Sequence, residues 1–145
     1  MPAAAASLER FVTAQREIYA RVCDELRGGL KRSHWMWFIF PQIAGLGHSP
    51  MAQRYGIADL PEAEAYLRHP VLAPRLAECT DLMLAWAGTR SAEAVLGPID
   101  AMKLRSSMTL FAAAGGGGRF ERVIDLFFAG QRDERTLAIL GEIAV

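Results

Sequence analysis

The chain has 145 residues, of which 52% are hydrophobic and 22% are charged. This length and composition are typical of one folded core and exclude a largely disordered protein. Sixteen lysines and arginines balance 16 aspartates and glutamates, so no net charge attracts a nucleic-acid backbone, and we expect no such partner. No apolar run approaches the roughly 20 residues that span a bilayer, and the start lacks the features of a signal peptide. We therefore expect a soluble, cytoplasmic domain that does not contact membranes.

The cysteines and histidines do not form a recognisable metal-binding pattern. Cys23 and Cys79 lack CxxC partners, and His34, His48 and His69 lack the i, i+4 spacing of helical zinc ligands. We therefore expect no metal and no cofactor. Both cysteines lie among apolar helical neighbours, and we interpret them as buried free thiols.

The N-terminal third begins with a predicted helix. Apolar residues recur at spacings of three and four from Leu8 to Leu26, which predicts one long helix with Ser7 as its N-cap. Gly28 and Gly29 end it. Residues 1–6 are expected to form a flexible N-terminus. The next segment, 31–42, is too short and too evenly apolar for its pattern to distinguish a buried helix from a buried strand.

Helix start and stop signals then recur to the end of the chain. Besides Ser7, five further residues are predicted N-caps: Ser49, Asp59, Ser91, Asp100 and Asp133. Glu62 completes a capping box with Asp59, and a further helical face runs over 72–86. The helices are predicted to end at Gly56, at the His69-Pro70 pair, at Gly97, at the four glycines 115–118 and at Gly130.

These signals predict an all-α fold. No long alternating run, internal repeat or linker interrupts the chain, so residues 1–145 are expected to form a single domain. We predict a compact orthogonal array of about six to eight mostly short helices. A regular four-helix bundle fits less well, because too many of the helices are short.

The most distinctive stretch is Ser33 to Gln42, SHWMWFIFPQ. One interpretation is that its aromatic residues fill the core. The alternative is that they wall a pocket, because indole N–H groups, His34 and Gln42 need hydrogen-bonding partners when buried, and aromatic planes stack on bases. On this hypothesis His34, Trp35, Trp37 and Gln42 contact a ligand, and His34 is the candidate general acid or base.

The second candidate stretch is Asp100 to Phe111, DAMKLRSSMTLF. Spacings of three and four place Lys103, Ser106 and Ser107 on one polar face of a helix. Two serines in mid-helix indicate either close helix packing over small residues or an anion site formed with Lys103 or Arg105. The standard catalytic motifs are missing, and the loop GLGHSP is only superficially similar to a phosphate-binding turn.

Several unusual sequence segments occur in order along the chain: SHWMWFIFPQ, GLGHS, YLRHPVLAPRL, GPIDAMKLRSSMTLF and FERVIDLFFAGQRDERTLAIL. From Leu8 to Leu140 the chain resembles the family catalogued as domain of unknown function 1810. The resemblance implies a single all-α, cytoplasmic, bacterial domain with no established activity or catalytic residue. The label calpastatin sometimes given to members does not fit, because calpastatin segments are disordered and polar. The order of features after His69 is also distantly similar to the helical ADP-ribose glycosidases called NADAR proteins.

Two functions follow as hypotheses. The first is binding, and possible hydrolysis, of a nucleotide-like or ADP-ribose-type small molecule by His34, Trp35, Trp37, Gln42, Lys103, Arg105, Ser106 and Ser107. The second is a non-enzymatic interaction or oligomerisation module that docks a partner through the aromatic stretch 34–40. The expected assembly is a monomer or a small homo-oligomer.

Overall fold

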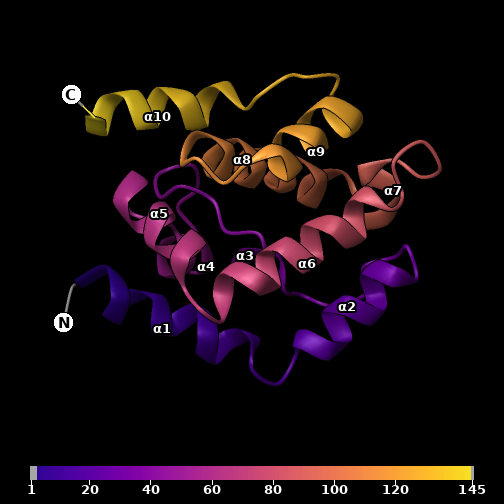
Figure 1. Ribbon diagram of the computed structural model, residues 1–145, viewed down its shortest axis with the longest axis horizontal. Coiled ribbons are helices and arrows are strands. Elements are labelled where there is room, and N and C mark those ends of the chain that lie inside the picture. The colour runs from indigo at the N-terminus through magenta and orange to yellow at the C-terminus, as the bar shows by residue number, and fades with distance from the viewer. Residues whose placement is uncertain (1–2, 145) are drawn as a thin grey trace.

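The computed structural model describes the backbone of residues 3–144 and the side chains of residues 8–141. Helices make up its regular structure, with one isolated parallel bridge between Ile43 and Ile57 (Figure 1). The helices are α1 (Ala3–Gln15), α2 (Tyr19–Arg27), α3 (Met36–Ile39), α4 (Pro50–Tyr55), α5 (Leu60–Arg68), α6 (Leu72–Leu84), α7 (Ala92–Leu96), α8 (Pro98–Ala113), α9 (Gly118–Phe128) and α10 (Glu134–Ala144). Seven of these have nine or more residues, so the predicted compact all-α fold is confirmed.

Helix α8 is the central element of the domain. It packs against α5, α7, α9 and α10, and in Figure 1 it lies between the α5 and α6 layer and α10. Most of its side chains from Leu104 to Phe111 are buried, including both serines and Thr109. A helical segment that is buried nearly all round belongs in the middle of a domain, and this part of α8 therefore fixes the positions of the helices around it.

A column of aromatic rings runs through the core and joins four helices. The Tyr66 ring of α5 packs edge-on against Phe11 of α1, with ring centres 5.3 Å apart, and at a tilt against Phe111 of α8, with ring centres 5.2 Å apart. Phe111 continues the column to Phe120 of α9 at 5.8 Å. Pairs at these separations add to the free energy gained by burying the rings.

The single long helix predicted from Leu8 to Leu26 is wrong. A turn at residues 16–18 divides it into α1 and α2, which pack against different neighbours: α1 against α3 and α5, and α2 against α6. One straight helix could not reach both sets of partners. Ser7 is not the N-cap, because the alanines before it are strong helix formers and α1 begins at Ala3. Residues 1–2 of the expected flexible segment 1–6 lie outside the described residues.

Four of the six predicted N-caps are confirmed. Ser49, Asp59, Ser91 and Asp133 each accept a hydrogen bond from the backbone N–H three residues later. Asp100 is not a cap, because Gly97 takes that position and Pro98 opens α8. Its carboxylate in the first turn of the helix is instead free to pair with lysines.

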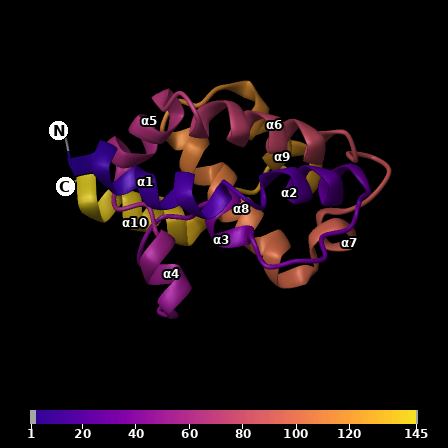
Figure 2. The ribbon, with the colours of Figure 1, turned by 90° about the horizontal axis from the view of Figure 1, so that it is seen from below.

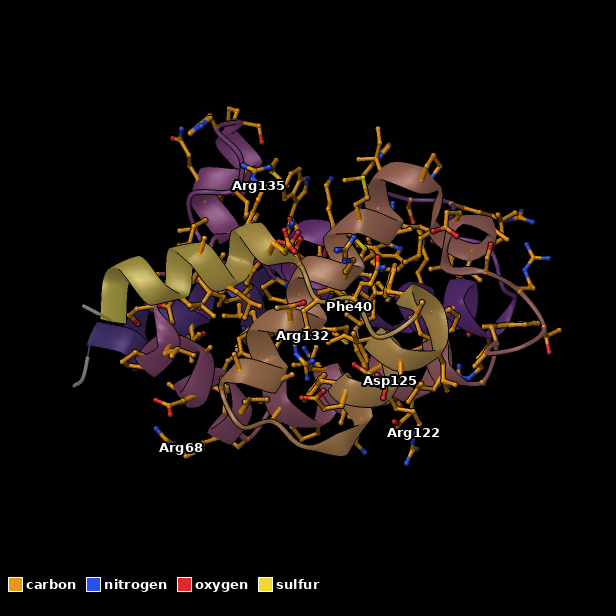
Figure 3. The ribbon with its side chains drawn as sticks, turned by 90° about the horizontal axis from the view of Figure 1, so that it is seen from above. Phe40, Arg68, Arg122, Asp125, Arg132 and Arg135 are labelled. Carbon is orange, nitrogen blue, oxygen red and sulfur yellow. The ribbon has the colours of Figure 1, made fainter. Side chains whose placement is uncertain are left out.

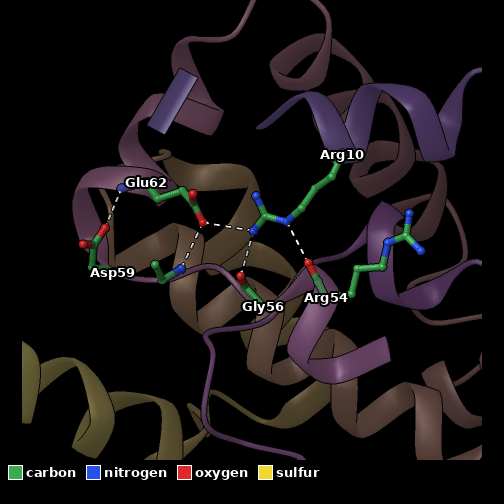
Figure 4. Close-up of polar contacts among 6 residues, drawn as sticks. Arg10, Arg54, Gly56, Asp59 and Glu62 are labelled. Atoms are coloured by element: carbon green, nitrogen blue, oxygen red, sulfur yellow. Dashed lines mark hydrogen bonds and ion pairs between the residues drawn. The ribbon is translucent and has the colours of Figure 1, made fainter. Parts of the chain in front are cut away.

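Helix α4 projects from the body of the domain and is held at its base by an arginine (Figures 2 and 4). The Arg10 guanidinium donates to the Arg54 carbonyl at 2.8 Å, to the Gly56 carbonyl at 2.8 Å and to Glu62 at 3.2 Å. Glu62 also accepts from the Ala58 N–H at 3.0 Å. This network fixes the chain between α4 and α5, and Ile57 in that segment is hydrogen-bonded to Gln42 and Ala44 of the loop that leads into α4.

The two cysteines are buried free thiols, as predicted. Burial raises the pKa of both thiols above the ordinary value, which keeps them protonated and poorly nucleophilic. Over the described residues, no helix combines the length and the apolar character needed to cross a bilayer.

Candidate functional site

A cleft of about 250 Å³ opens where the loop before α4, the first half of α8 and the start of α10 meet. Its lining residues are Trp37, Gln42, Leu46, Gly47, Ile99, Met102, Lys103, Arg105, Ser106, Asp133 and Arg135. Five of the residues selected from the sequence are in this set: Trp37, Gln42, Lys103, Arg105 and Ser106. The two candidate stretches, far apart in the chain, therefore meet at one site.

The contact that joins the two stretches is between Trp37 and Lys103. The Lys103 ammonium lies 3.7 Å from the centre of the Trp37 ring, a cation–π interaction. Asp100 holds the same ammonium at 3.2 Å and the Lys31 ammonium at 2.8 Å. Because Lys31 offsets the charge of Asp100, Lys103 brings a fixed positive charge to the cleft. The indole face that it covers is not free for a ligand to stack on.

Two arginines hold the start of α10 against the cleft. Arg105 donates to the carbonyls of Gln131 at 2.8 Å and Arg132 at 2.9 Å. Arg135 extends from the start of α10 (Figure 3) and donates to the Leu46 carbonyl at 3.0 Å. The part of the cleft that contains these two arginines is therefore built by contacts among α8, the start of α10 and the loop before α4.

The serines of α8 differ in their surroundings. The Ser106 hydroxyl lines the cleft and donates to the Met102 carbonyl at 3.2 Å. Ser107 is fully buried, and its hydroxyl has no hydrogen-bond partner among the described residues. Leu104 and Met108 are fully buried on the same side of α8 as Ser107, so Ser107 belongs to the core and not to the polar face predicted for it.

Trp35 is fully buried and lies outside the cleft lining. Its indole N–H donates to the Glu25 carboxylate at 2.9 Å, and the same carboxylate accepts from the backbone N–H groups of Arg32 at 2.8 Å and Ser33 at 3.2 Å and from the Ser33 hydroxyl. Burial alone would raise the pKa of Glu25, but these hydrogen bonds outweigh it and lower the pKa to about 2. Glu25 thus anchors the start of the aromatic stretch, while His34 is exposed and is not part of the lining.

Six lining residues were not selected from the sequence: Leu46, Gly47, Ile99, Met102, Asp133 and Arg135. Ile99 and Met102 are 71% and 69% exposed, which is unusual for large apolar side chains. Their i, i+3 spacing on a helix was a signal that could have identified them. Arg135 had no such local signal, because its role depends on where α10 packs.

The lining is suited to an organic anion. Lys103, Arg105 and Arg135 outnumber the one carboxylate of the lining, Asp133, so positive charge is in excess. The exposed side chains of Ile99 and Met102 supply an apolar surface. Among the described side chains, no three histidines, cysteines, aspartates or glutamates gather closely enough to hold a metal ion.

Comparison with known proteins places this fold in a family. The family model described as "Protein of unknown function (DUF1810)" matches residues 5–140. The chain belongs to the DUF1810 family. The crystal structure of the conserved hypothetical protein Rv1873 from Mycobacterium tuberculosis is similar to this DUF1810 chain, with 52% sequence identity and a TM-score of 0.89 over 92% of this chain and 96% of that one. No curated protein matches the chain.

Proposed function

We propose that this DUF1810 chain binds a small nucleotide-like or ADP-ribose-type molecule in the cleft between α8 and the loop before α4. The observation that carries the proposal is that Trp37, Gln42, Lys103, Arg105 and Ser106 line one cleft. A ligand site typically combines apolar surface with a few polar groups that fix orientation. The excess of positive charge complements a phosphate.

The lining supports binding rather than hydrolysis. Asp133 is its one carboxylate, and this group accepts hydrogen bonds from the backbone N–H and the hydroxyl of Thr136, so it caps α10. A general base must lie within hydrogen-bonding reach of the reacting group. His34, the candidate for that role, is not among the lining residues.

A thermal-shift titration with AMP, NAD and ADP-ribose tests the proposal. At a roughly hundredfold excess over Kd, a bound ligand is expected to raise Tm by about 5 °C or more. Lys103→Gln should abolish the shift. Arg90→Gln is the matched control, because Arg90 also lies over a tryptophan, with its guanidinium 5.9 Å from the Trp86 ring, and is outside the cleft. No shift with any of the three compounds would refute the proposal.

The alternative, an interaction module, has one observation in its favour: Ile99 and Met102 form an exposed apolar pair. The stretch 34–40 itself supports it less, because Trp35, Phe38 and Phe40 are buried. Light scattering separates the two functions. A dimer that Met102→Ser dissociates would favour the interaction module, and a monomer that binds nucleotide would favour the ligand site.

A further inference from the structure

The residues that line the cleft are ordered along α8. Ile99 and Met102 lie in its first turns, Lys103 follows, and Arg105 and Ser106 lie a turn further on. At 1.5 Å per residue, Ile99 and Ser106 are separated by about 10 Å along the helix axis. The α8 side of the lining therefore passes from an apolar end at Ile99 and Met102 to a polar end at Arg105 and Ser106, and the Lys103 ammonium reaches back toward Asp100 in the first turn.

The polar end is also where α10 meets α8. Arg105 donates to the carbonyls of residues 131 and 132, and the Asp133 N–H donates to the Thr109 hydroxyl at 3.0 Å. These contacts bring Arg135 to the same end as Ser106. Asp133 also lies at this end, but its carboxylate accepts hydrogen bonds from Thr136. The two arginines at this end, Arg105 and Arg135, outnumber this one carboxylate.

The volume limits what can occupy the cleft. At about 250 Å³ it is smaller than the roughly 300–1,000 Å³ of pockets that enclose drug-sized ligands. A nucleotide with one base, one sugar and one phosphate is about as long as this cleft. Its base matches the apolar end and its phosphate matches the polar end. The second phosphate and second ribose of ADP-ribose would extend into solvent and gain few contacts.

We propose, on the basis of the function proposed above, that the preferred ligand is a nucleoside monophosphate. Its base lies on Ile99 and Met102, and its phosphate is bound by Lys103 and Arg135. The base does not stack on the Trp37 face that Lys103 covers. Trp37 acts as a positioning residue that holds the ammonium in place for the phosphate.

Isothermal titration of the full chain with AMP, adenosine and ADP-ribose tests this proposal. A charge-assisted contact to phosphate makes AMP bind about tenfold or more tighter than adenosine. ADP-ribose should bind within about tenfold of AMP, because its extra atoms lie outside the cleft. Adenosine binding as tightly as AMP, or ADP-ribose binding more than about tenfold tighter than AMP, would overturn the monophosphate proposal and leave nucleotide binding intact. Absence of binding by all three compounds would refute both.

Two variants assign the two ends of the ligand. Arg135→Gln should weaken AMP about tenfold and leave adenosine unchanged, whereas Met102→Ser should weaken AMP and adenosine by the same factor. Arg122→Gln, an exposed arginine on α9 away from the cleft (Figure 3), is the control and should change neither. Equal weakening of AMP and adenosine by Arg135→Gln, with circular dichroism unchanged, would contradict the assignment of the phosphate.

Discussion

The indole N–H of Trp35 donates a hydrogen bond to the Glu25 carboxylate across 2.9 Å. Glu25 belongs to α2, and Trp35 immediately precedes α3. This contact therefore fixes the start of the aromatic stretch against α2. The same carboxylate also accepts from two backbone N–H groups and a hydroxyl of residues 32 and 33. One side chain therefore organises the loop that leads to Trp37 and the cleft.

Replacing this carboxylate should destabilise the protein. Glu25→Gln exchanges one acceptor oxygen for an amide donor that opposes the N–H groups facing it, and we expect a loss of about 2–3 kcal/mol in the free energy of unfolding. Urea denaturation followed by tryptophan fluorescence measures it. Glu17→Gln, at an exposed position in the turn between α1 and α2, is the control. Equal stability of the two variants would contradict the role of Glu25.

The same carboxylate predicts a pH dependence. The pKa of Glu25 is lowered from 4.5 to about 2 in the folded protein, so its contribution to stability is fully present above the unfolded value and is lost as the pH falls toward the folded value. The stability difference between wild type and Glu25→Gln should therefore shrink as the pH falls from about 5 to about 2. Urea titrations at several pH values test this, and a constant difference would contradict it.

Gly29 is expected to be intolerant of a side chain for two reasons. Its φ of +74° disfavours L residues, and an added Cβ would lie 2.9 Å from the Trp86 ring. Gly29→Ala should cost about 1–2 kcal/mol for the backbone and about 1–3 kcal/mol more for overpacking. Gly88, with a φ of +82° and open space around it, isolates the first cost. Thermal unfolding should thus show a larger loss for Gly29→Ala than for Gly88→Ala, and equal losses would exclude the steric contribution.

Ser107 provides the opposite case, a polar group whose removal is favourable. Its buried hydroxyl lacks a partner among the described residues, so Ser107→Ala should leave stability unchanged or raise it by about 1 kcal/mol. Ser106→Ala, which removes a hydrogen bond to the Met102 carbonyl, should instead lower it by about 0.5 kcal/mol. Chemical denaturation of both variants provides the comparison. A clear loss for Ser107→Ala would show that its hydroxyl is satisfied.

Local chemistry was predictable from the sequence because it depends on residues only a few positions apart. The caps at Ser49, Asp59, Ser91 and Asp133 each need an oxygen and an amide three residues later. Asp100 has the same local pattern but a different role, because Lys31 lies beside it in space. Whether such an aspartate caps a helix or pairs with a lysine depends on which side chains lie beside it in the folded chain. A local sequence pattern does not contain that information.

The candidate site was predictable only in part for the same reason. From the sequence, Trp37 and Lys103 were candidates in two separate stretches. In the structure the Lys103 ammonium lies 3.7 Å from the centre of the Trp37 ring. Arg135 joins them because Arg105 holds the loop before α10, a contact that depends on tertiary packing. Ser107 differs from Ser106 because the rotation of α8 turns it into the core. Trp35 precedes α3 and is buried where its indole N–H donates to Glu25.

The aromatic column from Phe11 through Tyr66 and Phe111 to Phe120 has a consequence for how the domain can be divided. Its rings come from the first, fifth, eighth and ninth helices, so every cut of the chain between them separates two rings that pack together and exposes both to water. The chain should therefore melt in one cooperative step. Two fragments made separately, for example 1–70 and 71–145, should each be unfolded alone and regain helical structure only on mixing.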